Sequence, residues 1–410
     1  MNNFIYGTHP KHIEDVKICT YAICKNELVH VHPWLDSVWA MGKGSDYIIV
    51  LDTGSTDGTY EELIKYGKEL GIPETQLIIK QQKYEMFRFD TARNDSLKLI
   101  PNSAAIDVCF CVDLDEYVEN ATFWEDIRKV VFDHPNFSRI YYKYAQHLNE
   151  DGSPATVIWY DKLHGVKNWH WEKPVHELLV TSDSIYQKNY YLPEDKIYLY
   201  HHQLPKTNRN NYIELLKLRI QESPDDIYAQ SYLASHLCEL GRYTESIIYY
   251  ESAILTVKKL QLSDDYFVVP TSYCGLGNCY YRLGLVDDAT HCYQRAIDIL
   301  PSYGEPYINM AQMLIYQGNI EKSSEVLNLF KSYAVKSVNW YERSYVWKEW
   351  KYMQILGDIL CWKQDIKASM EMFNNALQHI SRDGEQADAT EQGFFSDYEF
   401  VTKRFSNEFN

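Results

Sequence analysis

The stretch VLDTGSTDGT, residues 50–59, carries the first signal of the fold. An apolar run ends at Asp52, small turn-forming residues follow, and a helical pattern begins near Thr59. This order predicts a strand, a tight turn and a helix, and Gly54 lets the chain turn and approach a ligand closely. Asp52 would lie at the tip of the strand, where such sheets bind ligands, and Asp57 can cap the helix. The same pattern also fits a plain strand-to-helix connection.

The residues around this stretch, up to about residue 200, alternate short apolar runs with helical patterns. This alternation predicts a largely parallel sheet covered by helices, which binds ligands at the carboxyl ends of its strands. The later apolar runs, with Gly and Pro between them, indicate antiparallel strands. The predicted strands are 18–24, 47–51, 77–79, 106–112, 140–144 and 155–160, and the predicted helices are 29–41, 59–70, 91–99 and 123–132.

A second chemical motif, VDLDE at residues 112–116, follows one of the predicted strands. Asp113 and Asp115 are spaced i, i+2, so they point the same way in extended backbone. Two buried carboxylates without a cation repel each other and raise each other's pKa, and Mg²⁺ or Mn²⁺ removes that cost. The ion can then bridge a diphosphate and stabilise it as a leaving group. The alternative is a solvated acidic loop, since charged residues mostly stay exposed.

Two more motifs complete an ordered set: AICKNE at residues 22–27 and FDTARN at residues 89–94. Together the four motifs resemble family 2 glycosyltransferases with a GT-A fold, over residues 16 to about 205 and most specifically over 18–117. The resemblance implies a mixed-sheet α/β domain that binds a nucleotide sugar and a divalent metal. It implies nucleotide-sugar contacts from Cys24, Asn26, Glu27, Asp52, Ser55, Arg93, Asp113 and Leu114, and metal ligation by Asp115 and Asp113.

The segment WHWEKPVHE, residues 169–177, lies on the acceptor side in the same resemblance. An inverting transfer needs a carboxylate or imidazole that takes the acceptor's proton. Glu177 is the first candidate for this base, and Glu172 and His176 are the others. Trp169 and Trp171 form either a stacking wall for the sugar or part of the core, because both uses bury ring area.

The segment YLYHH, residues 198–202, supplies one more candidate. The resemblance implies that His201 is a further metal ligand, and imidazole can join carboxylates on Mn²⁺. A histidine that follows a strand is otherwise usually structural. The predicted cofactor is therefore Mn²⁺ or Mg²⁺.

After residue 207 the pattern changes to long amphipathic helices separated by polar turns. Four helix pairs align, with segments that start at Leu233, Leu276, Met310 and Leu356. Their spacing matches the tetratricopeptide pattern of about 34 residues, which predicts a helical solenoid. Small residues recur at Ala234, Gly277, Ala311 and Gly357, and turn glycines at Gly241, Gly284 and Gly318, with Gln364 at the equivalent place in the fourth pair.

The predicted organisation is therefore a GT-A catalytic domain at 1–205, a tetratricopeptide-like domain at 206–380 and a C-terminal tail at 381–410. Family 2 proteins with such arrays include enzymes that glycosylate bacteriocin peptides, and this chain resembles that architecture. The solenoid is either a spacer or dimerisation unit, which would give a homodimer, or a concave surface for a peptide or protein acceptor.

Composition excludes several other classes. The chain has 410 residues with 40 basic and 57 acidic side chains, a formal net charge of -17. This charge disfavours nonspecific binding to nucleic acid or anionic membranes. No apolar run approaches the ~20 residues of a membrane span, and the polar N-terminus and scattered cysteines predict a reducing, cytoplasmic setting.

We therefore expect a metal-dependent, inverting glycosyltransferase that uses a UDP-sugar and modifies a peptide, a protein or a glycan. One alternative is a catalytically inactive scaffold whose solenoid binds protein partners. Another is a transferase that modifies DNA bases, which the acidic charge disfavours. A nucleotidyltransferase would also pair carboxylates with a metal, but its glycine-rich phosphate loop is absent from the sequence.

Overall fold

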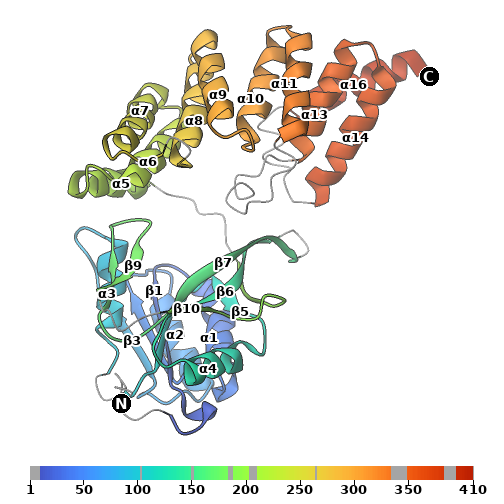
Figure 1. Cartoon of the computed structure of the whole chain (residues 1–410). Coiled ribbons are helices and arrows are strands. Elements are labelled where there is room, and N and C mark those ends of the chain that lie inside the picture. Colours follow the sequence, from blue (N-terminus) through green and yellow to red (C-terminus); the bar gives the residue numbers. More distant parts are fainter. Residues whose placement is uncertain are drawn as a thin grey trace. The chain divides into compact units, whose positions relative to one another are not determined.

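A computed structural model of the chain describes residues 10–101, 104–148, 152–182, 188–202, 210–263, 266–333, 349–382 and 394–409. The chain divides into two compact units, Met1–Asn208 and Arg209–Asn410. The first combines strands and helices, and the second is helical (Figure 1). None of the described helices has the length and apolar character that a membrane span requires.

The N-terminal unit is built on a twisted mixed sheet. Its parallel half has the order β3-β2-β1-β4, with bounds Leu77–Gln81, Tyr47–Asp52, Ile18–Cys24 and Val108–Cys111. The register pairs Cys24 with Asp52 across β1 and β2, so the two strands end together. The parallel strands predicted from the sequence are therefore present, and their carboxyl ends share one edge, which we call the motif edge.

The other half of the sheet is mostly antiparallel. The order continues from β4 as β7-β6-β11-β5, and β10 also pairs with β6. β11 returns to the motif edge, because His201 at its end pairs with Glu116 in β5. A separate hairpin joins β8 to β9. The bounds are Glu116–Val118 (β5), Phe137–Leu148 (β6), Pro154–His164 (β7), Trp169–Glu172 (β8), Leu178–Thr181 (β9), Lys188–Tyr191 (β10) and Ile197–His201 (β11).

The two faces of the sheet are covered by different elements, because side chains alternate along each strand. Helices α1 (Val31–Trp39), α2 (Thr59–Glu69) and α4 (Phe123–Asp133) pack on the face that carries Ile18, Ala22, Val108 and Phe110. The opposite face, with Tyr21 and Cys111, is covered by the β8–β9 hairpin and by α3 (Phe89–Leu97). Short 3-10 turns lie at Ile13–Asp15, Leu28–His30 and Ala40–Gly42.

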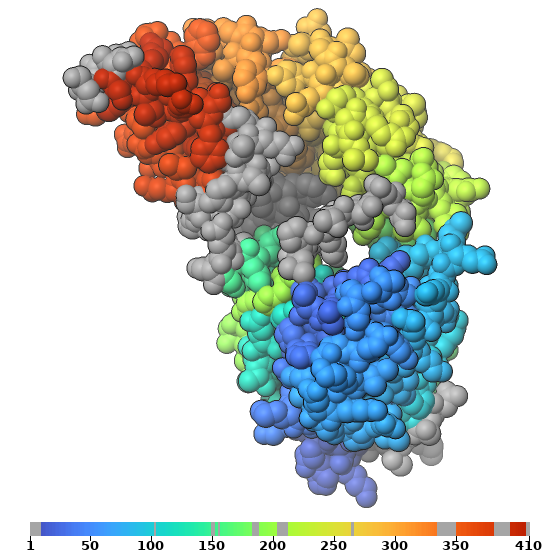
Figure 2. Space-filling view, turned by 180° about the vertical axis from the view of Figure 1, so that it is seen from behind, coloured from blue at the N-terminus to red at the C-terminus, as the bar shows by residue number. Residues whose placement is uncertain are grey.

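The C-terminal unit is a series of helix pairs that follow one another in sequence order, as the colours show in Figures 1 and 2. Helix α5 (Asn210–Glu222) comes first, and α16 (Phe394–Phe409), which lies within the predicted tail, packs on the last pair through Phe394 and Val401. The pairs are α6 (Ile227–Glu239) with α7 (Tyr243–Lys259), α8 (Val268–Arg282) with α9 (Val286–Ile299), α10 (Glu305–Tyr316) with α11 (Ile320–Tyr333), and α13 (Glu349–Trp362) with α14 (Ile366–Arg382).

The residues that recur in the sequence make the same contact in the first, third and fourth pairs. The hydroxyls of Ser246, Ser323 and Ser369 donate to the carbonyls of Ala234, Ala311 and Gly357, twelve residues earlier, at 2.7, 2.8 and 2.8 Å. The three turn glycines have φ of 72°, 78° and 75°, and Gln364 has φ of 67° at the equivalent place. The helical repeat predicted from the sequence is therefore confirmed, and one backbone conformation ends each first helix even where the side chain is not glycine.

Candidate functional site

The loop after β2 is fixed to the end of β1 by its own polar side chains. Asp52 is fully buried, and its Oδ1 accepts hydrogen bonds from the backbone N–H groups of Gly54 and Ser55, both at 2.8 Å, and from Gln81 at 3.0 Å. The thiol of Cys24 lies 3.7 Å from its other oxygen. Burial is the main cause that raises the pKa of Cys24, so this thiol stays protonated and its side chain is part of the interior.

Asn26 and Glu27 hold the same loop from the other side. Asn26 has φ of 57°, and its side-chain oxygen accepts from the backbone N–H of Thr56 at 2.8 Å. Its own N–H donates to the Ser55 hydroxyl at 2.8 Å, and the N–H of Glu27 donates to the Thr59 hydroxyl at 2.9 Å. The first and second sequence motifs therefore form one connected surface at the motif edge.

Arg93 links three segments of the chain at this edge. Its guanidinium binds both oxygens of Asp113, at 2.9 and 3.0 Å, and its Nε donates to Glu177 at 2.5 Å. It also lies 5.1 Å from the centre of the Trp171 ring, and its side chain is buried. Burial opposes its charge, but Asp113 attracts it and the pKa of Arg93 is raised. The third motif, the fourth motif and the acceptor-side segment therefore meet at one guanidinium.

A second buried cation, Lys162 on β7, binds two carboxylates of the acidic turn that follows β4. Its Nζ lies 3.1 Å from Oδ2 of Asp113 and 3.3 Å from each oxygen of Glu116. Burial disfavours the charged form of Asp113, but Arg93 and Lys162 hold its pKa well below the usual range. Burial outweighs Lys162 at Glu116, so the pKa of Glu116 is raised. Sequence reasoning missed Lys162, because it lies two residues beyond the predicted strand and belongs to no motif.

Asp115 contacts β11. Its Oδ2 lies 3.3 Å from Nε2 of His201, whose Nδ1 is 3.2 Å from the carbonyl of Gln146. Burial lowers the pKa of His201, but the hydrogen bond with Asp115, the charges of Asp115 and Glu116 and the contact with the Gln146 carbonyl together raise it above its usual value. Leu114 between the two aspartates is buried in the core, so its side chain faces inward.

The predicted metal ligands separate into two groups. Asp115 and His201 form a carboxylate and imidazole pair that fits one divalent ion, while Asp113 is held by cations. Within the described ranges, no group of three or more His, Cys, Asp or Glu side chains is arranged to hold a metal ion. The pair fits an ion that takes its remaining ligands from a diphosphate and water, as Mg²⁺ often does.

The three candidate bases differ in their surroundings. Glu177 is mostly buried and contacts Arg93. Glu172 is exposed, with its carboxylate 3.1 Å from His170, and His176 is exposed with φ of 48°. Glu177 is therefore the only one of the three that these contacts tie to the acidic motif.

Trp169 and Trp171 lie on the inner side of the β8–β9 hairpin and are 8% and 6% exposed. The indole N–H of Trp171 donates to the Tyr21 hydroxyl at 2.9 Å, and Tyr21 in turn lies 2.9 Å from Nε2 of His164. Arg139 lies 5.1 Å from the Trp169 ring. These contacts fit the packing interpretation of both rings, since little of either side chain is exposed.

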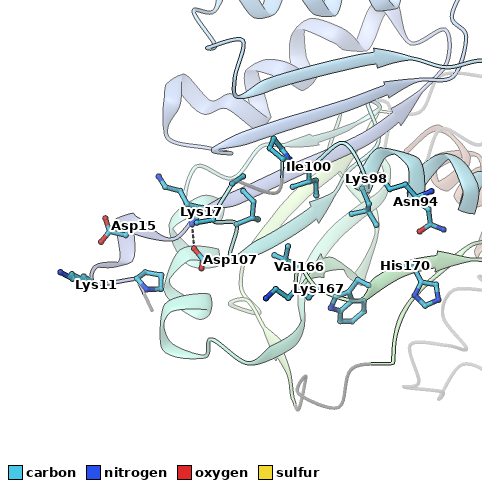
Figure 3. A pocket seen from close by; sticks show the side chains of 17 residues that line it. Lys11, Asp15, Lys17, Asn94, Lys98, Ile100, Asp107, Val166, Lys167 and His170 are labelled. Atoms are coloured by element: carbon cyan, nitrogen blue, oxygen red, sulfur yellow. Dashed lines mark hydrogen bonds between the residues drawn. The ribbon is translucent and has the colours of Figure 1, made fainter. Parts of the chain in front are cut away.

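The large cavity of the N-terminal unit lies away from the motif edge. It has a volume of about 1080 Å³ and is lined by Lys17 and Ile106, which precede β1 and β4, and by Lys98, Lys167 and Trp169 (Figure 3). These positions mark the amino ends of the parallel strands, opposite Asp52 and Asp113. The charged network is at the other end of the sheet, so we assign the candidate site to the motif edge.

Comparison with known proteins identifies the helical unit. A tetratricopeptide repeat model matches residues 225–302. The C-terminal unit therefore contains tetratricopeptide repeats. No curated protein matches the chain. The match lies outside the N-terminal unit, so it says nothing about that unit's family.

Solved structures that match part of the chain share little sequence identity with it. The Cut9–Hcn1 complex of the APC/C is 13% identical with a TM-score of 0.38, over 48% of this chain and 34% of that chain. TTC0263, a tetratricopeptide protein of Thermus thermophilus, is 14% identical with a TM-score of 0.34, over 45% and 88%. YrrB, described as having an unusual peptide-binding site, is 15% identical with a TM-score of 0.32, over 48% and 87%.

Proposed function

We propose that the chain is a metal-dependent, inverting glycosyltransferase of the GT-A type that uses a UDP-sugar. The observation that carries the proposal is that all four motifs lie at the motif edge, where direct contacts join the first motif to the second and the third to the fourth. Cys24 and Asn26 contact the loop of Asp52, while Arg93 joins the turn of Asp113 to Glu177. Carboxyl ends of parallel strands are where such sheets bind nucleotides.

The residues of this edge have separate tasks in the proposed reaction. The loop of Asp52 and Ser55, with Asn26 and Glu27, would bind the nucleoside. Hydrogen bonds within this loop fix its conformation before the donor binds. Asp115 and His201 would hold the divalent ion, which when bound supplies positive charge for the departing diphosphate. Arg93 fixes Asp113 and Glu177 in place.

Glu177 is the proposed base for the acceptor's proton, because its carboxylate belongs to the contact network of the site. Glu177 would have to weaken its ion pair with Arg93 to take the proton. Proton transfer would therefore depend on binding of the acceptor. Glu172 and His176 are the alternatives, since both are exposed beside the same hairpin. The tetratricopeptide unit is proposed to bind the acceptor, a peptide, a protein or a glycan, on its concave surface.

The test is release of UDP from a panel of UDP-sugars by purified protein in Mn²⁺. We expect release with at least one donor, and loss of release in Asp115→Ala and in EDTA. Asp133→Ala is the matched control, because Asp133 is exposed at the end of α4 and has no place in the site. Activity that survives both EDTA and Asp115→Ala would remove the metal mechanism.

One observation favours a second candidate, a catalytically inactive scaffold. Both oxygens of Asp113 contact Arg93 or Lys162, and the described side chains assemble no three-ligand metal group. The repeat unit would then be the functional part. Calorimetry with UDP and Mn²⁺ separates the two candidates: absence of binding by a folded sample supports the scaffold, and binding supports the transferase.

A further inference from the structure

Lys162 is a buried cation surrounded by anions. Its side chain is 9% exposed, and three carboxylate oxygens from Asp113 and Glu116 lie within 3.3 Å of Nζ. The ring of Tyr160 is 4.9 Å away. An ammonium group in this setting remains charged, because loss of its proton would leave the buried Glu116 and the partly buried Asp113 with one cation fewer.

The carboxylates that Lys162 binds also accept hydrogen bonds from other groups of the protein. Both oxygens of Asp113 accept from Arg93, and one also accepts from Lys162. Glu116 accepts from Lys162, from the Tyr144 hydroxyl at 3.0 Å and from the backbone N–H of Asp113 at 3.0 Å. Of the three acidic side chains in this turn, Asp115 alone is directed to a histidine.

We propose that Lys162 is a positioning residue that acts as a built-in cation, withholding Asp113 and Glu116 from the divalent ion and leaving the ion to Asp115 and His201. This inference rests on the proposed function, since it concerns the metal of the same site. An ion with two protein ligands binds the free protein weakly and needs the diphosphate to complete its coordination. Metal and nucleotide therefore bind as a coupled pair.

Removal of the lysine should convert the acidic turn into a stronger metal site. In Lys162→Met, Asp113 and Glu116 lose their shared cation, so a divalent ion becomes their best replacement partner. Affinity for such ions rises with the number of charged ligands. We expect Mn²⁺ to bind the free variant about tenfold more tightly than the wild type, and binding to depend less on UDP.

The experiment is titration of Mn²⁺ by calorimetry at pH 8, with and without UDP, on the full chain. Lys162→Arg keeps the charge and should behave like the wild type, while Glu116→Gln in the Lys162→Met background should cancel the gain. Equal or weaker Mn²⁺ binding by Lys162→Met would overturn the proposal. If that variant does not fold, Glu116→Gln alone decides: unchanged Mn²⁺ and UDP binding supports the proposal, and lost Mn²⁺ binding contradicts it.

The same titrations distinguish a wrong role for Lys162 from a wrong proposed function. A wild type that binds UDP and Mn²⁺ together, beside a Lys162→Met variant without the gain, contradicts the inference alone. A wild type that binds neither contradicts the proposed function, and tighter Mn²⁺ binding by the variant would still support the role of Lys162.

Discussion

The N-terminal unit holds its motif edge with opposite charges from distant segments, whereas the C-terminal unit repeats one close helix contact. Arg93 and Lys162 are buried, and their carboxylate partners lie between 20 and 84 residues away in sequence. Ser246, Ser323 and Ser369 each bond a carbonyl twelve residues earlier. A contact repeated at constant spacing leaves a periodic signal in the sequence, and a network of single contacts does not.

The two units should therefore lose stability in different ways when a contact is changed. Buried ion pairs are costly to break because the partner left behind stays desolvated. Close helix contacts depend instead on the volume of one small residue. The predictions that follow test each kind of contact against a control in the same chain.

The largest effect is expected for Arg93→Met. The change removes a buried guanidinium from the carboxylates of Asp113 and Glu177, which are only partly buried, and we expect the free energy of unfolding to fall by about 3 kcal/mol. Urea denaturation followed by tryptophan fluorescence measures it. Arg242→Met is the matched control, because Arg242 pairs with Glu245 on the surface of the solenoid and its loss should leave the midpoint unchanged. Equal effects of the two substitutions would contradict the distinction between the units.

A smaller loss is expected for Gly277→Ala in the solenoid. A Cβ at this position would lie 2.5 Å from Cε1 of Tyr293, whose ring is buried. Overpacking of this kind costs about 1–3 kcal/mol, against a gain in helix propensity of about 1 kcal/mol. Thermal denaturation of the single and double variants tests the cause. In a Tyr293→Ala background the same substitution should be neutral or stabilising, and a loss there would mean that the ring is not the obstacle.

The sequence predicted the elements whose pattern is local or repeated. The first four parallel strands and the helix pairs follow from periodicity, because hydrophobic spacing reports which side of an element is buried. Gln364 marks a harder case: its side chain departs from the repeat, yet its backbone adopts the positive φ of the glycines. Alignment of the four helix pairs identified Gln364 as the turn position of the fourth pair. Its backbone keeps the turn conformation because packing of the two helices fixes the turn.

The shared edge of the motif residues was predicted from the sequence, but their pairing was not. Motif order indicated that Asp52, Arg93, Asp113 and Asp115 share one edge, and all four lie there. Nothing in the motifs indicated that Asp113 would contact two cations while Asp115 contacts His201. This pairing depends on strand β7, which places Lys162 next to Asp113. A lysine in a strand of aromatic and apolar residues was the one available signal of this pairing.

A pH-dependent loss of about 1 kcal/mol is expected from His164. Burial lowers its pKa to about 3, so the folded state binds no proton where the unfolded chain, with a pKa near 6.5, does. Stability therefore falls as pH drops below about 6.5, and between pH 7 and 5.5 this residue alone accounts for about 1 kcal/mol. Urea midpoints of wild type and His164→Gln at both pH values give the measurement. The variant is less stable at pH 7 but should lose less on acidification, and parallel losses would assign the effect to other groups.

The smallest effects are expected where the repeated hydroxyl bond is removed or added. Ser369→Ala removes the bond to the Gly357 carbonyl and should cost about 1 kcal/mol. Ala289 occupies the equivalent position in the second pair, twelve residues after Gly277, and is fully buried. Ala289→Ser should therefore add the missing bond and stabilise the unit by up to about 1 kcal/mol. Thermal denaturation of both variants tests the equivalence of the pairs. A loss in both would show that the second pair, with Tyr293 packed against Gly277, is already too tight for a hydroxyl, and that the contact is shared in position but not in the space around it.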